Sequence, residues 1–458
     1  MGGMTQTSNL YYGEKVYSEE GIGHGDFDSH YPTQLKGRMP ARPHTIYDAE
    51  KGICTEATKP TLYMLKRYVE LGYYYVMTLD IKDVKLKEGV TFPFIYISQL
   101  GQTNLSEKIY HVNGKVIETK GVYRITITNF DWAIYISQYH IKGVNIIAVD
   151  LYSTNHLPRY MQNTIDHFYR EKTRLKKKEN WSKENGRSEA EIEEAHLNLM
   201  LSKGRLNGIF GCCYTRIIRE QIKIDLKTLT FNDKWDSDKA LYDYYNKKKS
   251  CLQYYHGVFC TAKARYELWY VISKVIGYDK TLYCDTDSCF YIPTPENQKR
   301  IKEYNDLCRA DSEKRGLYVD YVDEEGNKCR KYYHSFDQEK DSLKSKTFKS
   351  LHAKCYALEP DGKLECTIAG VGKWNSDHTI SREMELGSID RLESGTTFTE
   401  CGGFRSDYKS IRKFDYSLHT GGGCCLLPTT KTLSNAEMNE PLFISVDDDF
   451  FTDEPLEE

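Results

Sequence analysis

The stretch YCDTDSCF, residues 283–290, decides the fold that we predict for this chain. Leucine and tyrosine lie before its two aspartates, and phenylalanine, tyrosine and isoleucine follow them. Strand-forming residues on both sides of a short polar segment predict a β-hairpin with the aspartates at its tip. Because side chains on a strand alternate between faces, we expect Asp285 and Asp287 to point the same way and Thr286 to point the opposite way.

The two carboxylates of this hairpin need an explanation, because like charges held close together repel each other. A divalent cation bound by oxygen ligands would balance them. Asp and Thr are also ordinary turn residues, so a solvated turn is the alternative. The apolar and aromatic flanks favour the metal site, since they predict that the hairpin is buried.

Composition places few limits on function. The chain has 458 residues, which is enough for several subdomains, and its 63 Lys and Arg nearly balance 66 Asp and Glu, for a net charge of -3. This balance does not exclude nucleic acid, since the cations can gather on one face. The 14 cysteines show no CxxC spacing, so we expect reduced thiols in a cytoplasmic protein. No signal peptide and no apolar run of about 20 residues is found, so no membrane contact is expected.

The rest of the chain has recognisable segments. Residues 21–35, GIGHGDFDSHYPTQL, predict a strand that runs into a sharp turn at residues 29–32. Helical spacing predicts a helix from residue 157 to about 178. A second helix is expected to begin at SEAE, where Ser188 and Glu191 have the spacing of a capping box. We expect the crest between them, KKKENWSKENG, to be a loop.

Four short motifs occur in one order along the chain: DFDSHYP (26–32), KGRLNGIFG (203–211), YCDTDS (283–288) and KCY (354–356). Together they resemble motifs A, B, C and KxY of family B DNA polymerases. YYGE (11–14) and HGVFCTAKARYEL (256–268) are similar to segments of the protein-primed bacteriophage branch of that family. The resemblance extends from about Tyr11 to Tyr356 and fades towards the C-terminus.

The resemblance implies an α+β fold, a right-hand polymerase core with palm, helical fingers and thumb. The expected divisions are palm 1–40, a first insertion 41–150 that engages priming protein and DNA, fingers 151–213, a second insertion 214–255 for strand displacement and processivity, palm 256–364, thumb 365–435 and an acidic, disordered tail 436–458.

The same resemblance implies the chemistry of the site. Asp26, Asp285 and Asp287 are the expected catalytic residues. Asp26 and Asp287 are expected to bridge two Mg²⁺ ions, with the Phe27 carbonyl as a further ligand and Asp285 in support; Mn²⁺ is expected to substitute. Two metal ions stabilise the attacking and leaving oxygens of nucleotidyl transfer.

The expected nucleotide-binding residues are Phe27, Ser29, Tyr31, Lys203, Asn207 and Phe210. Lys203, Asn207 and Phe210 are spaced by four and three, so they share one face of a helix. Tyr31 corresponds to the tyrosine that obstructs a 2′-hydroxyl. Gly208 and Phe210 depart from the family, where Ser and Tyr are common, which puts fidelity and insertion rate in doubt more than the reaction.

The expected DNA-binding residues are Tyr11, Gly13, Arg265, Thr286, Lys354 and Tyr356. Period two predicts that Lys354 and Tyr356 lie on one face of a strand, where they hold the primer end. Contacts to phosphate carry no base information, so binding is expected to depend on salt and not on sequence. Basic residues between 170 and 183 are expected either to contact nucleic acid or to form a solvated face.

The implied function is template-directed DNA synthesis on primer-template DNA from deoxynucleoside triphosphates, in a phage or mobile element, with a terminal priming protein as a further expected partner. About 25 residues precede Asp26, so the family's exonuclease domain is not expected in this chain. Three explanations stay open: an enzyme without proofreading, a split gene whose separate chain carries the exonuclease, and a truncated reading frame. In each case this chain is expected not to trim unpaired primer ends.

Two other readings remain. A non-catalytic DNA-binding half of a split polymerase is the alternative from a different class. A reverse transcriptase or RNA-dependent polymerase is less favoured, because those enzymes usually place the two motif C aspartates side by side.

Overall fold

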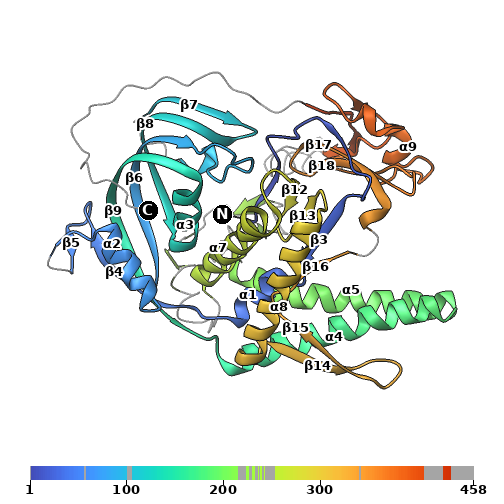
Figure 1. Cartoon of the computed structure of the whole chain (residues 1–458), viewed down its shortest axis with the longest axis horizontal. Helices are drawn as coiled ribbons and strands as arrows, with labels where there is room; N and C mark the ends of the chain where they lie inside the picture. Colours follow the sequence, from blue (N-terminus) through green and yellow to red (C-terminus); the bar gives the residue numbers. More distant parts are fainter. Residues whose placement is uncertain are drawn as a thin grey trace.

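The architecture is that of a computed structural model, which describes residues 2–55, 58–100, 106–214, 253–339, 342–406 and 426–434, with short pieces between 223 and 242. Figure 1 shows a large sheet on one side, a small sheet in the centre, a long helical hairpin that projects from it and a β-rich C-terminal part. None of the described helices is long and apolar enough to cross a membrane.

The central sheet has five antiparallel strands, which come from distant parts of the sequence. Their order is β1 (Thr5–Thr7), β12 (Thr281–Asp285), β13 (Ser288–Tyr291), β3 (Gly23–Phe27) and β16 (Phe336–Gln338). The predicted hairpin at YCDTDSCF is confirmed as β12 and β13, and its two strands are almost wholly buried.

Two glycines let aromatic rings lie across β3. A Cβ on Gly23 would stand 2.6 Å from the Tyr291 ring, and one on Gly25 would stand 2.2 Å from the Phe336 ring. Since real Cβ atoms do not approach that closely, glycine is required where these rings cover the strand. The strand is followed by a short helix, α1 (His30–Lys36), where the sequence predicted only a turn.

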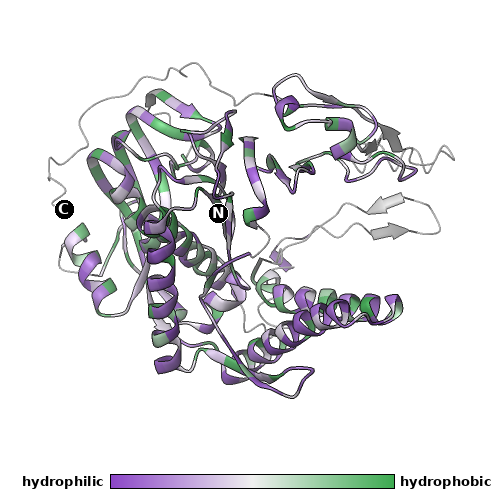
Figure 2. Cartoon of the chain, turned by 45° about the vertical axis from the view of Figure 1, so that its right-hand side comes forward, coloured by the Kyte–Doolittle hydropathy of each residue, from purple (hydrophilic) through white to green (hydrophobic). Residues whose placement is uncertain are grey.

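The large sheet is built from residues 39–155. Its order is β5 (Ile53–Cys54), β4 (Met39–Asp48), β9 (Tyr139–Asn155), β6 (Tyr74–Leu86), β8 (Lys115–Thr128) and β7 (Ser106–Val112), with α2 (Leu62–Glu70), a 3-10 turn (Ile97–Gln99) and α3 (Asn129–Gln138) beside it. Long strands rich in branched and aromatic residues suit such a sheet. Figure 2 shows hydrophobic residues concentrated along these strands.

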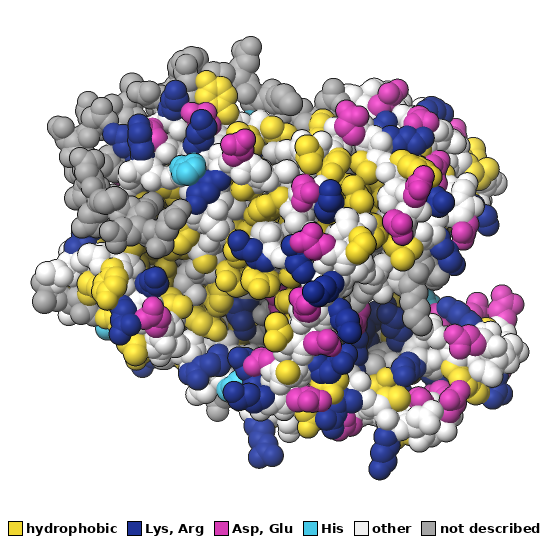
Figure 3. Space-filling model, in the orientation of Figure 1, with side chains coloured by type: hydrophobic (Ala, Val, Ile, Leu, Met, Phe, Trp, Pro, Cys, Tyr) yellow, Lys and Arg dark blue, Asp and Glu magenta, His cyan; other side chains and the backbone are white. Residues whose placement is uncertain are grey.

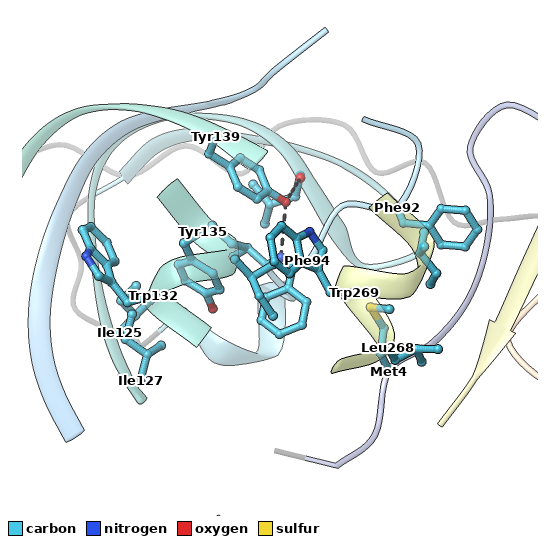
Figure 4. Close-up of a cluster of buried hydrophobic side chains, with 14 of the residues drawn as sticks. Met4, Phe92, Phe94, Ile125, Ile127, Trp132, Tyr135, Tyr139, Leu268 and Trp269 are labelled. Carbon is cyan, nitrogen blue, oxygen red and sulfur yellow. Dashed lines mark hydrogen bonds between the residues drawn. The ribbon is translucent and has the colours of Figure 1, made fainter. Parts of the chain in front are cut away.

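A buried cluster joins the large sheet to the centre of the molecule. It contains Phe94, Ile125 and Tyr135 of the large-sheet region, Leu268 and Trp269 of α7 (Tyr254–Tyr270), and Met4 of the N-terminal segment (Figure 4). Helix α7 continues as a π-helical stretch (Val271–Ile276) that leads into β12.

The projecting hairpin consists of α4 (Arg159–Glu184) and α5 (Glu189–Gly211), followed by a 3-10 turn (Cys212–Tyr214). The predicted capping box is confirmed, because the Ser188 hydroxyl accepts from the Glu191 N–H and Glu191 accepts from the Ser188 N–H. The predicted loop at the crest is wrong, since α4 runs on through most of it. Lysine, glutamate and asparagine there are compatible with a helix.

The remaining elements complete the centre and the C-terminal part. The helices are α8 (Pro295–Arg315) and α9 (Arg382–Leu386), with 3-10 turns at Ser342–Lys344 and Ile389–Arg391. A four-stranded sheet has the order β19 (Glu365–Ile368), β18 (Cys355–Pro360), β17 (Ser345–His352) and β2 (Lys15–Tyr17). Four strand pairs remain: β14 (Tyr318–Val322) with β15 (Lys328–Tyr332), β10 (Lys223–Asp225) with β11 (Thr230–Asn232), β20 (Thr397–Phe398) with β23 (Lys431–Thr432), and β21 (Phe404–Ser406) with β22 (Leu426–Pro428). Most of the predicted second insertion and the whole predicted tail lie outside the described residues.

Candidate active site

The end of β3 and the tip of the β12–β13 hairpin bring two carboxylates together. Asp26 lies opposite Ser288 in the sheet, and the Phe27 N–H donates to the Asp287 carbonyl oxygen at 2.8 Å. The expected strand alternation is wrong at the tip, because Asp285 ends β12 while Thr286, at φ +64°, and Asp287 form a two-residue turn. The period of two applies only to extended residues.

Asp26 and Asp287 are half-buried, and neither forms an ion pair within the part of the chain that the structure describes. Burial, and then the charges of Asp287, Asp28 and Glu339, raise the pKa of Asp26 to about 8, although Lys172 opposes them. Burial also raises the pKa of Asp287, to which Asp285 adds and which His30 opposes. The charge of Asp287 therefore disfavours the ionised form of Asp26, while burial and Asp285 disfavour that of Asp287.

Asp285 is in a different environment. Its carboxylate pairs with the Lys354 ammonium at 2.8 Å and accepts hydrogen bonds of 3.0 Å from the Thr5 and Thr286 hydroxyls. Its charge is therefore balanced within the protein. This arrangement fits the role that the resemblance implied for Asp285, which is to support the site and not to bridge the metal ions.

The uncompensated pair fits a divalent cation by the chemistry of its donors. Mg²⁺ prefers oxygen and is usually bound through one or two carboxylates together with water and substrate phosphates. Within the described parts of the chain, no group of three or more His, Cys, Asp and Glu side chains is placed to hold a metal ion. Asp26 and Asp287 thus offer a partial ligand set that substrate oxygens could complete.

The second aspartate of the DFDSHYP motif, Asp28, is neutralised by lysines. It forms ion pairs with Lys172 of α4 and, at 3.4 Å, with Lys331 of β15, while Lys172 also donates to the Ser29 hydroxyl at 2.9 Å. Burial alone would raise the pKa of Asp28, but Lys172 and Lys331 outweigh it and lower the pKa to about 2. These contacts bind the helical hairpin to the end of β3.

Sequence reasoning did not single out Asp28 and Lys172. The second acid in DFDSHYP was a local signal for Asp28, whereas no local pattern separates Lys172 from its neighbouring lysines. Lys172 is 8% exposed, although it belongs to the basic run for which a solvated face was one expectation.

Lys203 of α5 lies beside these groups. Burial, and then the nearby charges of Lys172 and Lys176, lower its pKa. Such a gathering of ammonium groups attracts anions, in particular phosphates. Figure 3 shows Lys and Arg side chains beside the hollow above the projecting hairpin.

The structure joins two of the predicted nucleotide residues directly. The rings of Tyr31 in α1 and Phe210 in α5 stack with centroids 4.2 Å apart. Asn207, which is exposed, lies on the same helix as Lys203 and Phe210. Ser29 stands immediately before α1 at φ +53°, so the polypeptide turns sharply from β3 into the helix.

A half-buried carboxylate, Glu267, holds the start of α1 in place. Glu267 of α7 accepts from His30 and His334, each at 3.0 Å, and from Gln34. Burial disfavours its charge, but His334 and His30 outweigh this effect and lower the pKa of Glu267 far below its usual range. Because His30 stacks on Phe27 at 4.4 Å, this network supports the residue next to Asp26.

The predicted strand position of Lys354 is wrong. Lys354 has φ +55° in the turn before β18, so it does not share a strand face with Tyr356. Its side chain reaches Asp285, while the Tyr356 ring packs 4.9 Å from the Tyr283 ring. The two residues are still neighbours of the hairpin that carries the aspartates.

The other predicted DNA contacts are distributed differently. The Tyr11 hydroxyl donates to the Asp279 carbonyl, and the Gly13 N–H donates to the Ser350 carbonyl at 2.9 Å. Arg265 is only 2% exposed and forms an ion pair of 2.9 Å with buried Asp131. This burial contradicts the DNA contact expected for Arg265, and the guanidinium serves the interior of the protein.

The fold has relatives among solved structures, although no protein-family model and no curated protein matches the chain. Phi29 DNA polymerase complexed with primer-template DNA matches with a TM-score of 0.57 at 17% identity, over 94% of this chain and 61% of that one. Its complex with primer-template DNA and incoming nucleotides matches with a TM-score of 0.55 at 16% identity, over 95% and 61%. The chain therefore has the fold of these polymerase structures and spans about three fifths of their length.

Because Asp26 and Asp28 lie in opposite electrostatic environments, replacing each by Asn should change the free energy of unfolding in opposite directions. Between pH 3.8 and about 8 the folded chain holds a proton on Asp26 that the unfolded chain releases, so the free energy of unfolding falls as pH rises through this range. In metal-free buffer at pH 8, Asp26→Asn should raise the free energy of unfolding by about 1 kcal/mol or more.

Asp28→Asn is the matched change, and it should lower the free energy of unfolding by about 1 to 3 kcal/mol, because it leaves Lys172 buried without its partner. Urea unfolding of both variants measures the two effects. A loss of stability in Asp26→Asn would show that the carboxylate is balanced by a group of the protein.

Proposed function

We propose that this chain is a DNA-directed DNA polymerase, which adds deoxynucleotides to the 3′ end of a primer on a DNA template. One observation carries the proposal: two half-buried carboxylates with raised pKa values, Asp26 and Asp287, stand next to a cluster of lysines from the projecting hairpin. The likeness to phi29 DNA polymerase supports the same reading, since it extends over nearly the whole chain.

In this proposal Asp26, Asp287 and the Phe27 carbonyl hold Mg²⁺, or Mn²⁺ in its place. Bound there, divalent ions supply charge stabilisation for the attacking and leaving oxygens of nucleotidyl transfer. The role of the protein is to hold these oxygen donors close together, where a bound cation balances their charge. Asp285 supports the turn from outside, because Lys354 already balances its charge.

The lysine cluster is the proposed site for the triphosphate of an incoming deoxynucleotide. Lys203 and Lys172 offer positive charge at the base of α4 and α5, and Ser29 offers a hydroxyl next to Lys172. The stacked rings of Tyr31 in α1 and Phe210 in α5 are the proposed contacts for the sugar and base of a nucleotide bound by the lysines.

Primer-template DNA is the proposed macromolecular partner. The solved structures of similar fold hold primer-template DNA or single-stranded DNA. Lys354 in the β17–β18 turn and Tyr356 in β18, both beside the aspartate hairpin, are the proposed contacts for the primer end. Contacts of this kind position a backbone without reading its sequence.

Primer extension tests the proposal directly. The purified chain should extend a primer on single-stranded DNA with four deoxynucleotides and Mg²⁺, and Asp287→Ala should abolish extension. Asp311→Ala removes a half-exposed carboxylate of α8 and is the matched control, which should extend normally. Absence of extension by a folded wild-type chain that binds the DNA would favour a non-catalytic half of a split enzyme.

Tyr31 is proposed to exclude a 2′-hydroxyl. Tyr31→Ala should raise the ratio of ribonucleotide to deoxynucleotide insertion about tenfold or more, which corresponds to about 1.4 kcal/mol of lost discrimination. Single-nucleotide insertion measures the ratio, with Tyr63→Ala, a change of an exposed tyrosine of α2, as the control. An unchanged ratio in Tyr31→Ala would remove this role.

A further inference from the structure

The segment from Gly2 to Thr7 lies against the site, although none of its residues belongs to the motifs of the sequence analysis. Strand β1 is the edge of the central sheet and pairs Thr5 with Asp285 and Thr7 with Tyr283. The Thr286 N–H donates to the Met4 carbonyl at 2.7 Å. The backbone of the segment therefore follows β12 up to the turn that carries the aspartates.

Two anchors hold this segment in place. The Met4 side chain is 1% exposed and belongs to the same buried cluster as Leu268 and Trp269 of α7 (Figure 4). The Arg265 guanidinium donates to the Gly2 carbonyl at 2.7 Å, and Asp131 holds the guanidinium. Since the Arg265–Asp131 pair is buried, the start of the segment is attached to a rigid part of the protein.

Two residues of the segment touch the site itself. The Thr5 hydroxyl donates to the Asp285 carboxylate at 3.0 Å. A Cβ on Gly3 would stand 2.7 Å from the Tyr31 hydroxyl oxygen and 2.8 Å from Cγ2 of Thr286. At those distances any side chain at position 3 must displace one of its neighbours, so glycine here leaves room for Tyr31 and Thr286 together.

We propose that Gly3 and Thr5 of this segment are positioning residues of the site: Gly3 determines sugar specificity, and Thr5 positions Asp285. This proposal rests on the proposed polymerase function. Gly3 sets how closely the Tyr31 ring can stand to the aspartate turn, and Tyr31 is the residue proposed to exclude ribonucleotides. The segment thus acts on the nucleotide through Tyr31 and not by contact of its own.

The test compares Gly3→Ala with Gly2→Ala. A Cβ on Gly2 has no atom within 4 Å, so Gly2→Ala is a matched control one residue away. In single-nucleotide insertion, Gly3→Ala should raise the ratio of ribonucleotide to deoxynucleotide insertion about tenfold, and Gly2→Ala should stay within about twofold of the wild type. General damage to the fold would lower both insertions alike and leave the ratio unchanged.

A second readout does not depend on catalysis. In the full chain labelled with 3-fluorotyrosine, the ¹⁹F resonance of Tyr31 is the one that Tyr31→Phe removes. Gly3→Ala should shift this resonance, and Gly2→Ala should not. A shift without a change in the insertion ratio would overturn the specificity role, and an unshifted resonance with an unchanged ratio would overturn the proposal as a whole.

The Thr5 claim has its own variants, which add no atoms and keep it testable if Gly3→Ala does not fold. Thr5→Val removes the donor to Asp285, whereas Thr7→Val removes a buried hydroxyl that has no hydrogen-bond partner among the described residues. Thr5→Val should lower the insertion rate about threefold to tenfold with little change in the nucleotide KM. Equal rates in the two variants would contradict positioning of Asp285.

These outcomes separate the inference from the proposed function. If neither the wild type nor Gly2→Ala extends a primer, the polymerase function fails, and the ¹⁹F resonance alone decides whether Gly3 positions Tyr31. If both extend normally and Gly3→Ala matches them in ratio and resonance, the function stands and the inference fails.

Discussion

Repulsion between the half-buried carboxylates of Asp26 and Asp287 is the constraint on which the rest of the site depends. The charge of Asp287 makes the charge of Asp26 more costly, and the partial burial of both side chains reduces the water that would otherwise screen them. The sheet nevertheless holds them together, through the backbone hydrogen bond between Phe27 and Asp287 and the pairing of β3 with β13. Stability spent in this way is typical of sites that bind a cation or carry out chemistry.

The neighbouring acids show how local this constraint is. Asp28 and Asp285 lie within two residues of the repelling pair, yet each is matched by a lysine, Lys172 for Asp28 and Lys354 for Asp285. Both lysines come from elements that must meet the central sheet, the projecting hairpin and the β17–β18 turn. The same ion pairs that balance charge thus also fix the three parts of the molecule around the uncompensated pair.

Sequence reasoning reached the features that are encoded locally. The aspartate hairpin and the Ser188 capping box followed from residue types over a few positions, and both are present. The prediction of alternating strand faces failed at Thr286, because the backbone there forms a turn and is not extended. Sequence reasoning also failed where a partner lies far away in sequence, since nothing near Arg265 shows that Asp131 buries it. Lys172 was missed for the same reason.

The central claim is that Asp26 and Asp287 together hold divalent metal. Anomalous diffraction at the manganese edge, from crystals of the chain with primer-template DNA, an incoming nucleotide and Mn²⁺, measures this most directly. The account predicts anomalous peaks within coordination distance of both carboxylates and none between Asp285 and Lys354. Peaks that avoid Asp26 and Asp287 would contradict it.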